Sequence, residues 1–220
     1  MNIAIDGPAG AGKSTIAKAV ARELNSIYVD TGAMYRAMAL YMLKNDISPD
    51  DTESIGKACE SADISIVYKD GAQHVILNGE DVTGELRTEA VGNMASSVSV
   101  NGKVRKKLVS LQQKLAHSTS VVMDGRDIGT VVLPDADLKI YLTASVETRA
   151  DRRYKELIEK GQQPDLDEIR RDIADRDHRD MNRENSPLRQ AEDAVLVDSS
   201  DMTIPEVVDR ILGLTEGLHK

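Results

Sequence analysis

Nine consecutive residues near the start of the chain have the types and spacing of a loop that binds a chain of phosphates. The first eight match the pattern G-x-x-x-x-G-K-[S/T] at every position. Glycines let such a backbone curl until successive N–H groups point at one phosphate chain. Lys13 is expected to reach the β and γ oxygens, and the Ser14 hydroxyl to ligate Mg²⁺. The predicted nucleotide-binding residues are Gly7, Pro8, Ala9, Gly10, Ala11, Gly12, Lys13, Ser14 and Thr15.

A second set of candidate residues consists of arginines that follow predicted strands or lie on predicted helices. Arg36 and Arg126 each follow a strand, and Arg176, Asp180 and Arg183 fall on one helix face. Arginine clamps stabilise the charge that spreads over a phosphoryl group during its transfer, and a phosphorylated acceptor needs further arginines. The alternative interpretation is a solvated helix with surface ion pairs. Three further candidates lie on a separate helical segment that precedes the one with Arg176: Arg149, Arg152 and Arg153.

The predicted elements place the phosphate loop between a strand and a helix. Residues 2–6 form an apolar run that ends at Gly7-Pro8, and helical spacing follows from about Gly12. A chance glycine-rich turn would have no reason to occupy this position. The helix N-terminus adds its dipole to the predicted anion site.

Strands and helices alternate at both ends of the chain, which predicts an α/β fold with a parallel sheet. Further buried strands are expected at 26–29, 120–124, 138–142 and 194–198, and helices at about 32–45, 145–182 and 203–216. Between them, alternating runs at 63–68 and 74–77 with a Lys69-Asp70-Gly71 turn predict a small antiparallel hairpin or meander. Helical signals return from about 85 to 117. We therefore predict a three-layer α/β/α domain over 1–220 with five core strands and an inserted subdomain at about 62–98.

Composition excludes several classes of function. A net charge of −9 argues against a broad nucleic-acid surface. Cys59 is the only cysteine, which excludes an internal disulfide, and the four histidines lack metal-ligand spacing. Because we see no secretory leader and no apolar stretch of about 18 residues, we expect a cytoplasmic protein without a membrane partner. No surplus apolar helix face stands out, so we expect a monomer.

Two classes of phosphate-loop protein remain, a nucleotide-dependent switch and a kinase of a small acceptor. A guanine-specific switch would carry an Asn-Lys-x-Asp segment, which the sequence lacks. Asp124 ends an apolar strand and could serve as a second Mg²⁺ ligand in either class. The arginines favour the kinase, and the acceptor could be CMP, UMP, AMP or a phosphorylated metabolite.

Three segments together resemble the bacterial cytidylate kinase (CMP/dCMP kinase) family. They are Asp30-Thr-Gly-Ala-Met-Tyr-Arg36, Asp124-Gly-Arg-Asp-Ile-Gly-Thr-Val-Val132 and Arg176-Asp-His-Arg-Asp-Met-Asn-Arg183. Their order and spacing are specific, and the likeness covers essentially the whole chain. The resemblance implies a core, an acceptor-binding region and a mobile lid at about 149–180, with ATP, CMP and dCMP as substrates and Mg²⁺ as cofactor.

The resemblance also assigns roles to individual residues. Thr31, Arg105 and Asp127 would face the cytosine ring, and Arg36, Arg126 and Arg183 would hold the acceptor phosphate. Arg176 and Asp180 would meet the sugar, while Arg149, Arg152 and Arg153 would close on the ATP phosphates. The predicted catalytic residues are Lys13, Arg126, Arg149, Arg152, Arg153 and Arg183. Asp30 could position the sugar or cap the next helix.

Elementary chemistry agrees with the assignment of cytosine to Asp127 and Arg105. Cytosine presents an exocyclic N4 donor beside two acceptors, N3 and O2. The Asp127 carboxylate can accept a hydrogen bond from the N4 amino group of cytosine. Uracil carries the acceptor O4 at that position, so the lone pairs of O4 and of the carboxylate would repel each other. A loop cap at a strand end is the alternative role for Asp127. No general base is needed, because an acceptor phosphate with a second pKa of about 6 is already largely a dianion.

Overall fold

The chain divides into two compact units. A computed structural model describes residues 1–69 and 71–219. Unit 1 comprises Met1–Tyr28 and Ser120–Lys220, and unit 2 comprises Val29–Thr119. The insertion expected at 62–98 lies inside unit 2, and Asp70 of the predicted turn lies outside the described residues. The division of the chain into one domain with an insertion and a lid stays a prediction.

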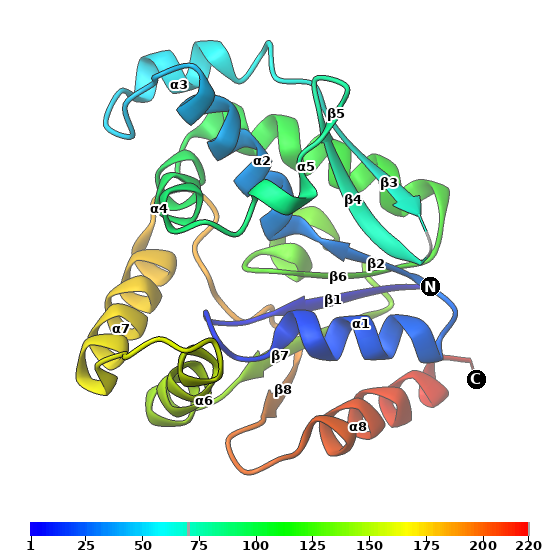
Figure 1. The fold of residues 1–220 in the computed structure, drawn as a ribbon. Helices are drawn as coiled ribbons and strands as arrows, with labels where there is room; N and C mark the ends of the chain where they lie inside the picture. Colours follow the sequence, from blue (N-terminus) through cyan, green and yellow to red (C-terminus); the bar gives the residue numbers. More distant parts are fainter. Residues whose placement is uncertain (70, 220) are drawn as a thin grey trace. The chain divides into compact units, whose positions relative to one another are not determined.

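The parallel sheet has the strand order β2-β6-β1-β7-β8 (Figure 1); four of its strands belong to unit 1, and β2 begins in unit 1 and ends in unit 2. β1 pairs in parallel with β6 and β7, and β7 pairs with β8. The strands are nearly continuous apolar runs, as expected for a sheet that is covered on both faces. They are β1 (Asn2–Asp6), β2 (Ile27–Asp30), β6 (Val121–Gly125), β7 (Leu138–Thr143) and β8 (Val195–Asp198).

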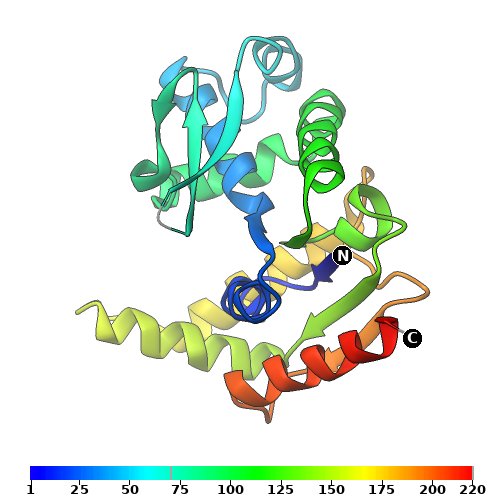
Figure 2. The same ribbon diagram turned by 90° about the vertical axis from the view of Figure 1, so that its right-hand side faces the viewer.

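Helices α1 (Lys13–Glu23) and α8 (Ile204–Glu216) pack against each other beside this sheet (Figure 2). Their apolar faces join the strands in one core, with Ile5, Val20 and Ile211 among its fully buried members. α8 begins with a capping box, in which Thr203 and Glu206 exchange side-chain and backbone hydrogen bonds, and with a proline in its first turn.

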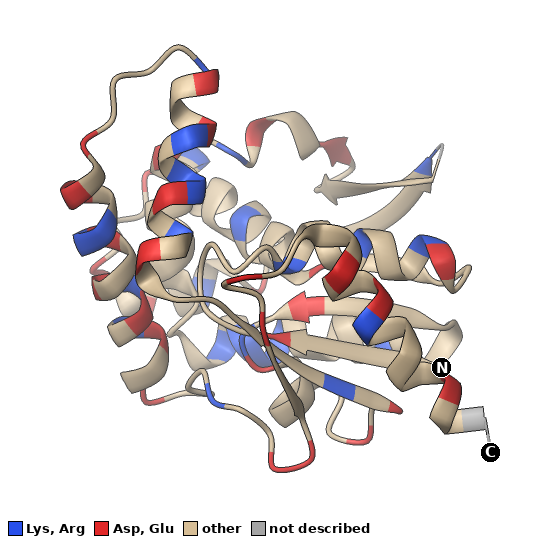
Figure 3. Cartoon of the chain, turned by 90° about the horizontal axis from the view of Figure 1, so that it is seen from below, with Lys and Arg blue, Asp and Glu red and all other residues tan. Residues whose placement is uncertain are grey.

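The long charged segment predicted at 145–182 forms two helices, α6 (Val146–Glu159) and α7 (Leu166–Asn182). Gly161 lies in the left-handed region at φ 76°, which ends α6. The Asp165 side chain then accepts from the Glu168 N–H and starts α7. α6 and α7 pack side by side, with basic and acidic residues interleaved along them (Figure 3).

Unit 2 combines helices with a three-stranded antiparallel sheet of order β3-β4-β5. Its core is rich in methionine, and Met34, Met38, Met42 and Met94 are all buried. Unbranched methionine side chains fill irregular spaces, which suits a chain without Phe or Trp. Its elements are α2 (Thr31–Lys44), α3 (Thr52–Ala58), β3 (Ile64–Lys69), β4 (Ala72–Leu77), β5 (Glu80–Asp81), η1 (Thr83–Glu85), α4 (Glu89–Val98) and α5 (Gly102–Ser118).

The predicted fold class is confirmed, with a five-stranded parallel sheet and a separate antiparallel sheet. The helical structure predicted over about 85–117 is confirmed and consists of α4 and α5, with η1 before them; the Asn101 side chain accepts from Lys103 N and Val104 N and starts α5. α3, the π-helical turn η2 (Ile128–Val132) and the terminal 3-10 turn η3 (Gly217–His219) were not predicted. Over the described residues, no helix has the length and apolarity to span a membrane.

Candidate functional site

The predicted phosphate loop runs from the end of β1 to the first turn of α1. Gly7 has φ 152°, and a Cβ there would lie 1.9 Å from the Leu142 carbonyl oxygen of β7. Only glycine therefore fits where the loop crosses that strand. Gly12 precedes the helix in the left-handed region at φ 83°. The loop and its strand–helix context are thus as the sequence predicts.

Lys13 is buried inside this loop. The residue is only 6% exposed, and its Nζ donates to the Pro8 carbonyl oxygen at 2.7 Å. Burial lowers the Lys13 pKa to about 7, and repulsion from Arg126 adds to the effect, while Asp124 and Asp6 oppose it. An anion bound in the loop would supply the negative charge that a protonated Lys13 needs.

Ser14 and Asp124 meet at the start of α1. The Ser14 hydroxyl donates to Asp124 Oδ2 at 2.9 Å, and the Tyr28 hydroxyl donates to Asp124 Oδ1 at 2.8 Å. A hydroxyl oxygen beside a carboxylate is a hard-oxygen donor set of the kind Mg²⁺ takes when substrate phosphates and water complete its shell. The pair therefore fits the predicted metal. Tyr28 was missed, since nothing in its strand pattern indicates a partner 96 residues away.

Asp6, also missed, connects the base of the phosphate loop to the segment after β6. Its two carboxylate oxygens accept from the backbone N–H groups of Ile128 and Gly129 at 2.8 and 2.7 Å. These two residues follow Asp127 directly, so Asp6 fixes the backbone at that position. An aspartate at the end of a buried apolar strand was the available signal. Burial raises the pKa of Asp6 to about 6, although the two N–H groups partly offset the shift.

The raised pKa of Asp6 predicts a specific dependence of stability on pH. Because the folded-state value lies above the ordinary 3.8, the folded protein binds a proton more readily than the unfolded chain between these values. The associated stabilisation is fully present below about pH 4 and is lost as pH rises through about 6. Relative to the Asp6→Asn variant, the free energy of unfolding should fall by about 2 to 3 kcal/mol from about pH 4.5 to about pH 7.

Urea denaturation of both proteins at the two pH values measures this difference. Asp201→Asn, which changes an exposed aspartate, is the matched control, and the gap between wild type and this variant should not change with pH. A gap between wild type and Asp6→Asn that stays constant with pH would contradict the assignment of the raised pKa.

Arg149 lies buried against the phosphate loop rather than in solvent. Its Nη1 donates to the Ala9 carbonyl oxygen at 2.9 Å, and its Nε donates to the Ala144 carbonyl oxygen at 2.9 Å. Its Nη2 lies 2.7 Å from Asp177 Oδ2, which makes a buried ion pair between α6 and α7. In this structure Arg149 thus supports the loop from outside.

The other two predicted arginines of α6 have different surroundings. Arg152 Nη2 donates to the Ser199 carbonyl oxygen at 2.7 Å, after β8. Arg153 is about half exposed and pairs with Glu156 at 2.9 Å on the helix surface. The structure therefore does not gather these three arginines around one point.

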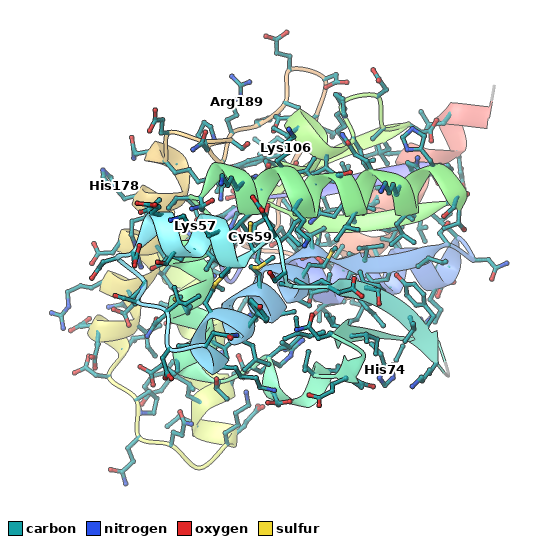
Figure 4. All side chains as sticks on the ribbon, turned by 90° about the horizontal axis from the view of Figure 1, so that it is seen from above. Lys57, Cys59, His74, Lys106, His178 and Arg189 are labelled. Carbon is teal, nitrogen blue, oxygen red and sulfur yellow. The ribbon has the colours of Figure 1, made fainter. Side chains whose placement is uncertain are left out.

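A charge cluster joins the segment after β6 to the end of α7. Arg126 Nε donates to Asp180 Oδ2 at 2.8 Å, and Arg183 Nη2 lies 3.6 Å from Asp127 Oδ1 with both side chains buried. Burial alone would raise the pKa of Asp180, but Arg126, Arg176 and Arg183 outweigh it and hold the pKa below its ordinary value. The structure thus brings together Arg126, Asp127, Asp180 and Arg183. His178 is exposed on α7 (labelled in Figure 4).

The remaining predicted residues belong to unit 2. The Asp30 side chain accepts from the Ala33 N–H at 2.9 Å, so it caps α2, which was one of its two expected roles. Thr31 is buried in the first turn of this helix. Arg105 is also buried, donates from Nη1 to the Ser99 carbonyl oxygen at 3.0 Å, and has its guanidinium carbon 5.6 Å from the centre of the Tyr35 ring. Arg36 is partly exposed on α2.

The chain is similar to known proteins over nearly its whole length. A sequence model described as cytidylate kinase matches residues 3–216. A cytidylate kinase of Caldicellulosiruptor bescii is 53% identical over 97% of this chain and 95% of its own length, and one of Halalkalibacterium halodurans is 51% identical over 97% and 96%. Among solved structures, a gluconokinase from Sinorhizobium meliloti shares the fold at TM-score 0.51 and 13% identity, covering 99% of this chain and 95% of its own.

Proposed function

Because the chain belongs to the cytidylate kinase family, we propose that it transfers the γ-phosphoryl group of ATP to CMP and dCMP, forming ADP and CDP or dCDP. The observation that carries the proposal is a family match over 3–216 in a chain whose phosphate loop is complete. The geometry supplies what this chemistry needs, namely anion-binding backbone groups, a buried lysine and arginines beside buried carboxylates.

ATP phosphates are proposed to bind in the loop from Gly7 to Thr15, with Lys13 on the β and γ oxygens. Ser14 and Asp124 would hold Mg²⁺, whose contribution is to neutralise phosphate charge. Tyr28 orients the Asp124 carboxylate by donating to its other oxygen. As its pKa is about 7 without ligand, Lys13 would become fully charged when the phosphates arrive.

The acceptor phosphate is proposed to bind Arg36, Arg126 and Arg183, and the sugar to bind Arg176 and Asp180. The low pKa of Asp180 supports this role, because a carboxylate that stays ionised can accept from sugar hydroxyls. No side chain has to remove a proton, since the acceptor phosphate is already mainly dianionic at neutral pH. Alignment and charge neutralisation then account for catalysis.

Cytosine is proposed to be recognised by Asp127, Thr31 and Arg105. In this arrangement the Asp127 carboxylate accepts from the N4 amino group, and Arg105 donates to N3 or O2. Asp6 supports the assignment, because it fixes the backbone directly after Asp127. The three arginines of α6 remain proposed ligands of the ATP phosphates. For Arg149 that role requires an exchange of its bonds to Ala9 and Asp177.

The experiment that tests the function is ADP formation from Mg-ATP with CMP, dCMP, UMP, AMP or no acceptor. We expect rapid turnover with CMP and dCMP, and at least about 100-fold lower kcat/KM with UMP. Preference for UMP or AMP would identify a kinase of another acceptor. Formation of ADP at the same rate with and without an acceptor would identify a nucleotide hydrolase instead.

A further inference from the structure

In unit 2, a single side chain of the hairpin holds the start of α2. Gln73 lies on β4, and its carboxamide makes two hydrogen bonds to the backbone of Asp30. Gln73 Oε1 accepts from the Asp30 N–H at 2.8 Å, and Gln73 Nε2 donates to the Asp30 carbonyl oxygen at 3.2 Å. A backbone N–H can only donate and a carbonyl can only accept, so this pair determines which way the amide points.

The two bonds reproduce the pattern by which one strand pairs with another. β2 is the last strand in the order of its sheet, so within the described part of the chain no strand pairs with its outer edge. Asp30 is the final residue of β2, and the Gln73 carboxamide satisfies both of its backbone groups. Leaving such groups unpaired in a partly buried position is costly, so this contact fixes the backbone firmly.

Asp30 transmits this constraint to the helix that follows. Its carboxylate caps α2 through the Ala33 N–H, and a Cβ on Gly32 would lie only 3.2 Å from Asp30 Oδ1. The same Cβ would lie 3.5 Å from Arg36 Nη1, so the Arg36 guanidinium is close to this turn. The orientation of Thr31 and Arg36 therefore depends on where the Asp30 backbone is held.

We propose that Gln73 is a positioning residue that fixes the acceptor-binding segment 30–36 through the Asp30 backbone. The inference rests on the proposed function in that Thr31 and Arg36 are taken to bind the acceptor. Gln73 touches neither ATP nor the reacting phosphates in this assignment. It should therefore govern the KM for CMP and leave the KM for ATP unchanged.

The test compares Gln73→Ala and Gln73→Glu with His74→Ala as the matched control. His74 is the next residue on β4 and contacts Asp81 of β5 instead of Asp30, so its loss perturbs the hairpin alone (labelled in Figure 4). Gln73→Ala should raise the KM for CMP about 10-fold, with kcat and the KM for ATP within about 2-fold of wild type. His74→Ala should stay within about 2-fold on all three.

Gln73→Glu separates positioning from simple packing. A carboxylate can accept from the Asp30 N–H but cannot donate to the Asp30 carbonyl, so at about pH 8 its KM for CMP should resemble that of Gln73→Ala. A protonated glutamic acid regains a donor. The KM ratio of Gln73→Glu to wild type should therefore fall as pH is lowered towards the ordinary pKa of glutamic acid, about 4.3.

Amide hydrogen exchange of residues 30–33, measured without substrates, tests the clamp apart from turnover. We expect faster exchange in Gln73→Ala and wild-type exchange in His74→Ala. Unchanged exchange in Gln73→Ala, equal rises in both KM values, or the same defects in His74→Ala would each overturn the inference. If wild type fails to phosphorylate CMP, the proposed function is wrong, and the exchange result still decides whether Gln73 fixes this segment.

Discussion

Replacing Lys13 by alanine should lower kcat about 100- to 1000-fold with CMP, dCMP and every other acceptor. Lys13 is the one side chain buried inside the phosphate loop whose charge can follow the transferring group, and its Nζ already points along the loop at Pro8. The expected effect is independent of the acceptor because the lysine is proposed to act on the donor phosphates. Initial rates of ADP formation at saturating ATP measure it directly.

Lys18→Ala is the matched control for this experiment. Lys18 is an exposed lysine of the same helix, and its ammonium lies 5.5 Å from the Tyr28 ring centre. We expect its kcat within about 3-fold of wild type. Thermal unfolding of Lys13→Ala should show no loss of stability, since the substitution removes a charge whose burial is unfavourable. Wild-type rates for Lys13→Ala would contradict the proposed role of the phosphate loop in the reaction.

Replacing Asp127 should abolish the discrimination between CMP and UMP while leaving the ATP site largely intact. The expected change in the ratio of kcat/KM values is about 100-fold or more, because a buried acceptor no longer selects for the N4 donor. Asp127 is only 5% exposed, so its carboxylate is shielded from competing water. The acceptor panel, run with Asp127→Ala and at several ATP concentrations, measures both effects.

A second variant guards against loss of structure, since Asp127→Ala also removes the carboxylate near Arg183. Asp127→Asn keeps the shape and can turn either its oxygen or its amino group towards the base. It should therefore accept UMP better than wild type does, with retained thermal stability. Asp135→Ala, at an exposed aspartate of the same connection, should keep wild-type selectivity. Unchanged preference for CMP in both Asp127 variants would contradict the base assignment.

Local patterns in the sequence were sufficient to predict the elements that carry the phosphate loop. β1 is a continuous apolar run bounded by a glycine and a proline, and α1 has regular helical spacing, so neighbouring residues alone determine both. By contrast, α3 has only seven residues and buries only Ile55 and Gly56, too few for a helical period to show. The break after α6 depends on the left-handed conformation of Gly161, which helix propensity alone does not reveal.

The contacts of the candidate site were less predictable than its members. Lys13, Ser14, Asp124 and the arginines can be picked out by residue type and spacing. Asp6, Tyr28 and Gln73 reach partners 122, 96 and 43 residues away, and such contacts arise only when the strands are assembled. The surroundings of Arg149 could not be foreseen for the same reason, since an arginine on a charged helix gives no sign that it will be buried.

The tethers on the phosphate loop affect the thermodynamics of binding. Gly7 passes against the β7 backbone, Lys13 holds the Pro8 carbonyl, and Arg149 holds the Ala9 carbonyl. With three successive residues restrained before any nucleotide arrives, the loop has little conformational entropy left to lose. The entropy lost on binding then comes mainly from the flexible triphosphate and from ordered water. When phosphates bind, Lys13 and Arg149 would exchange the Pro8 and Ala9 carbonyls for phosphate oxygens, so the phosphates take over the restraint of a backbone that is already ordered.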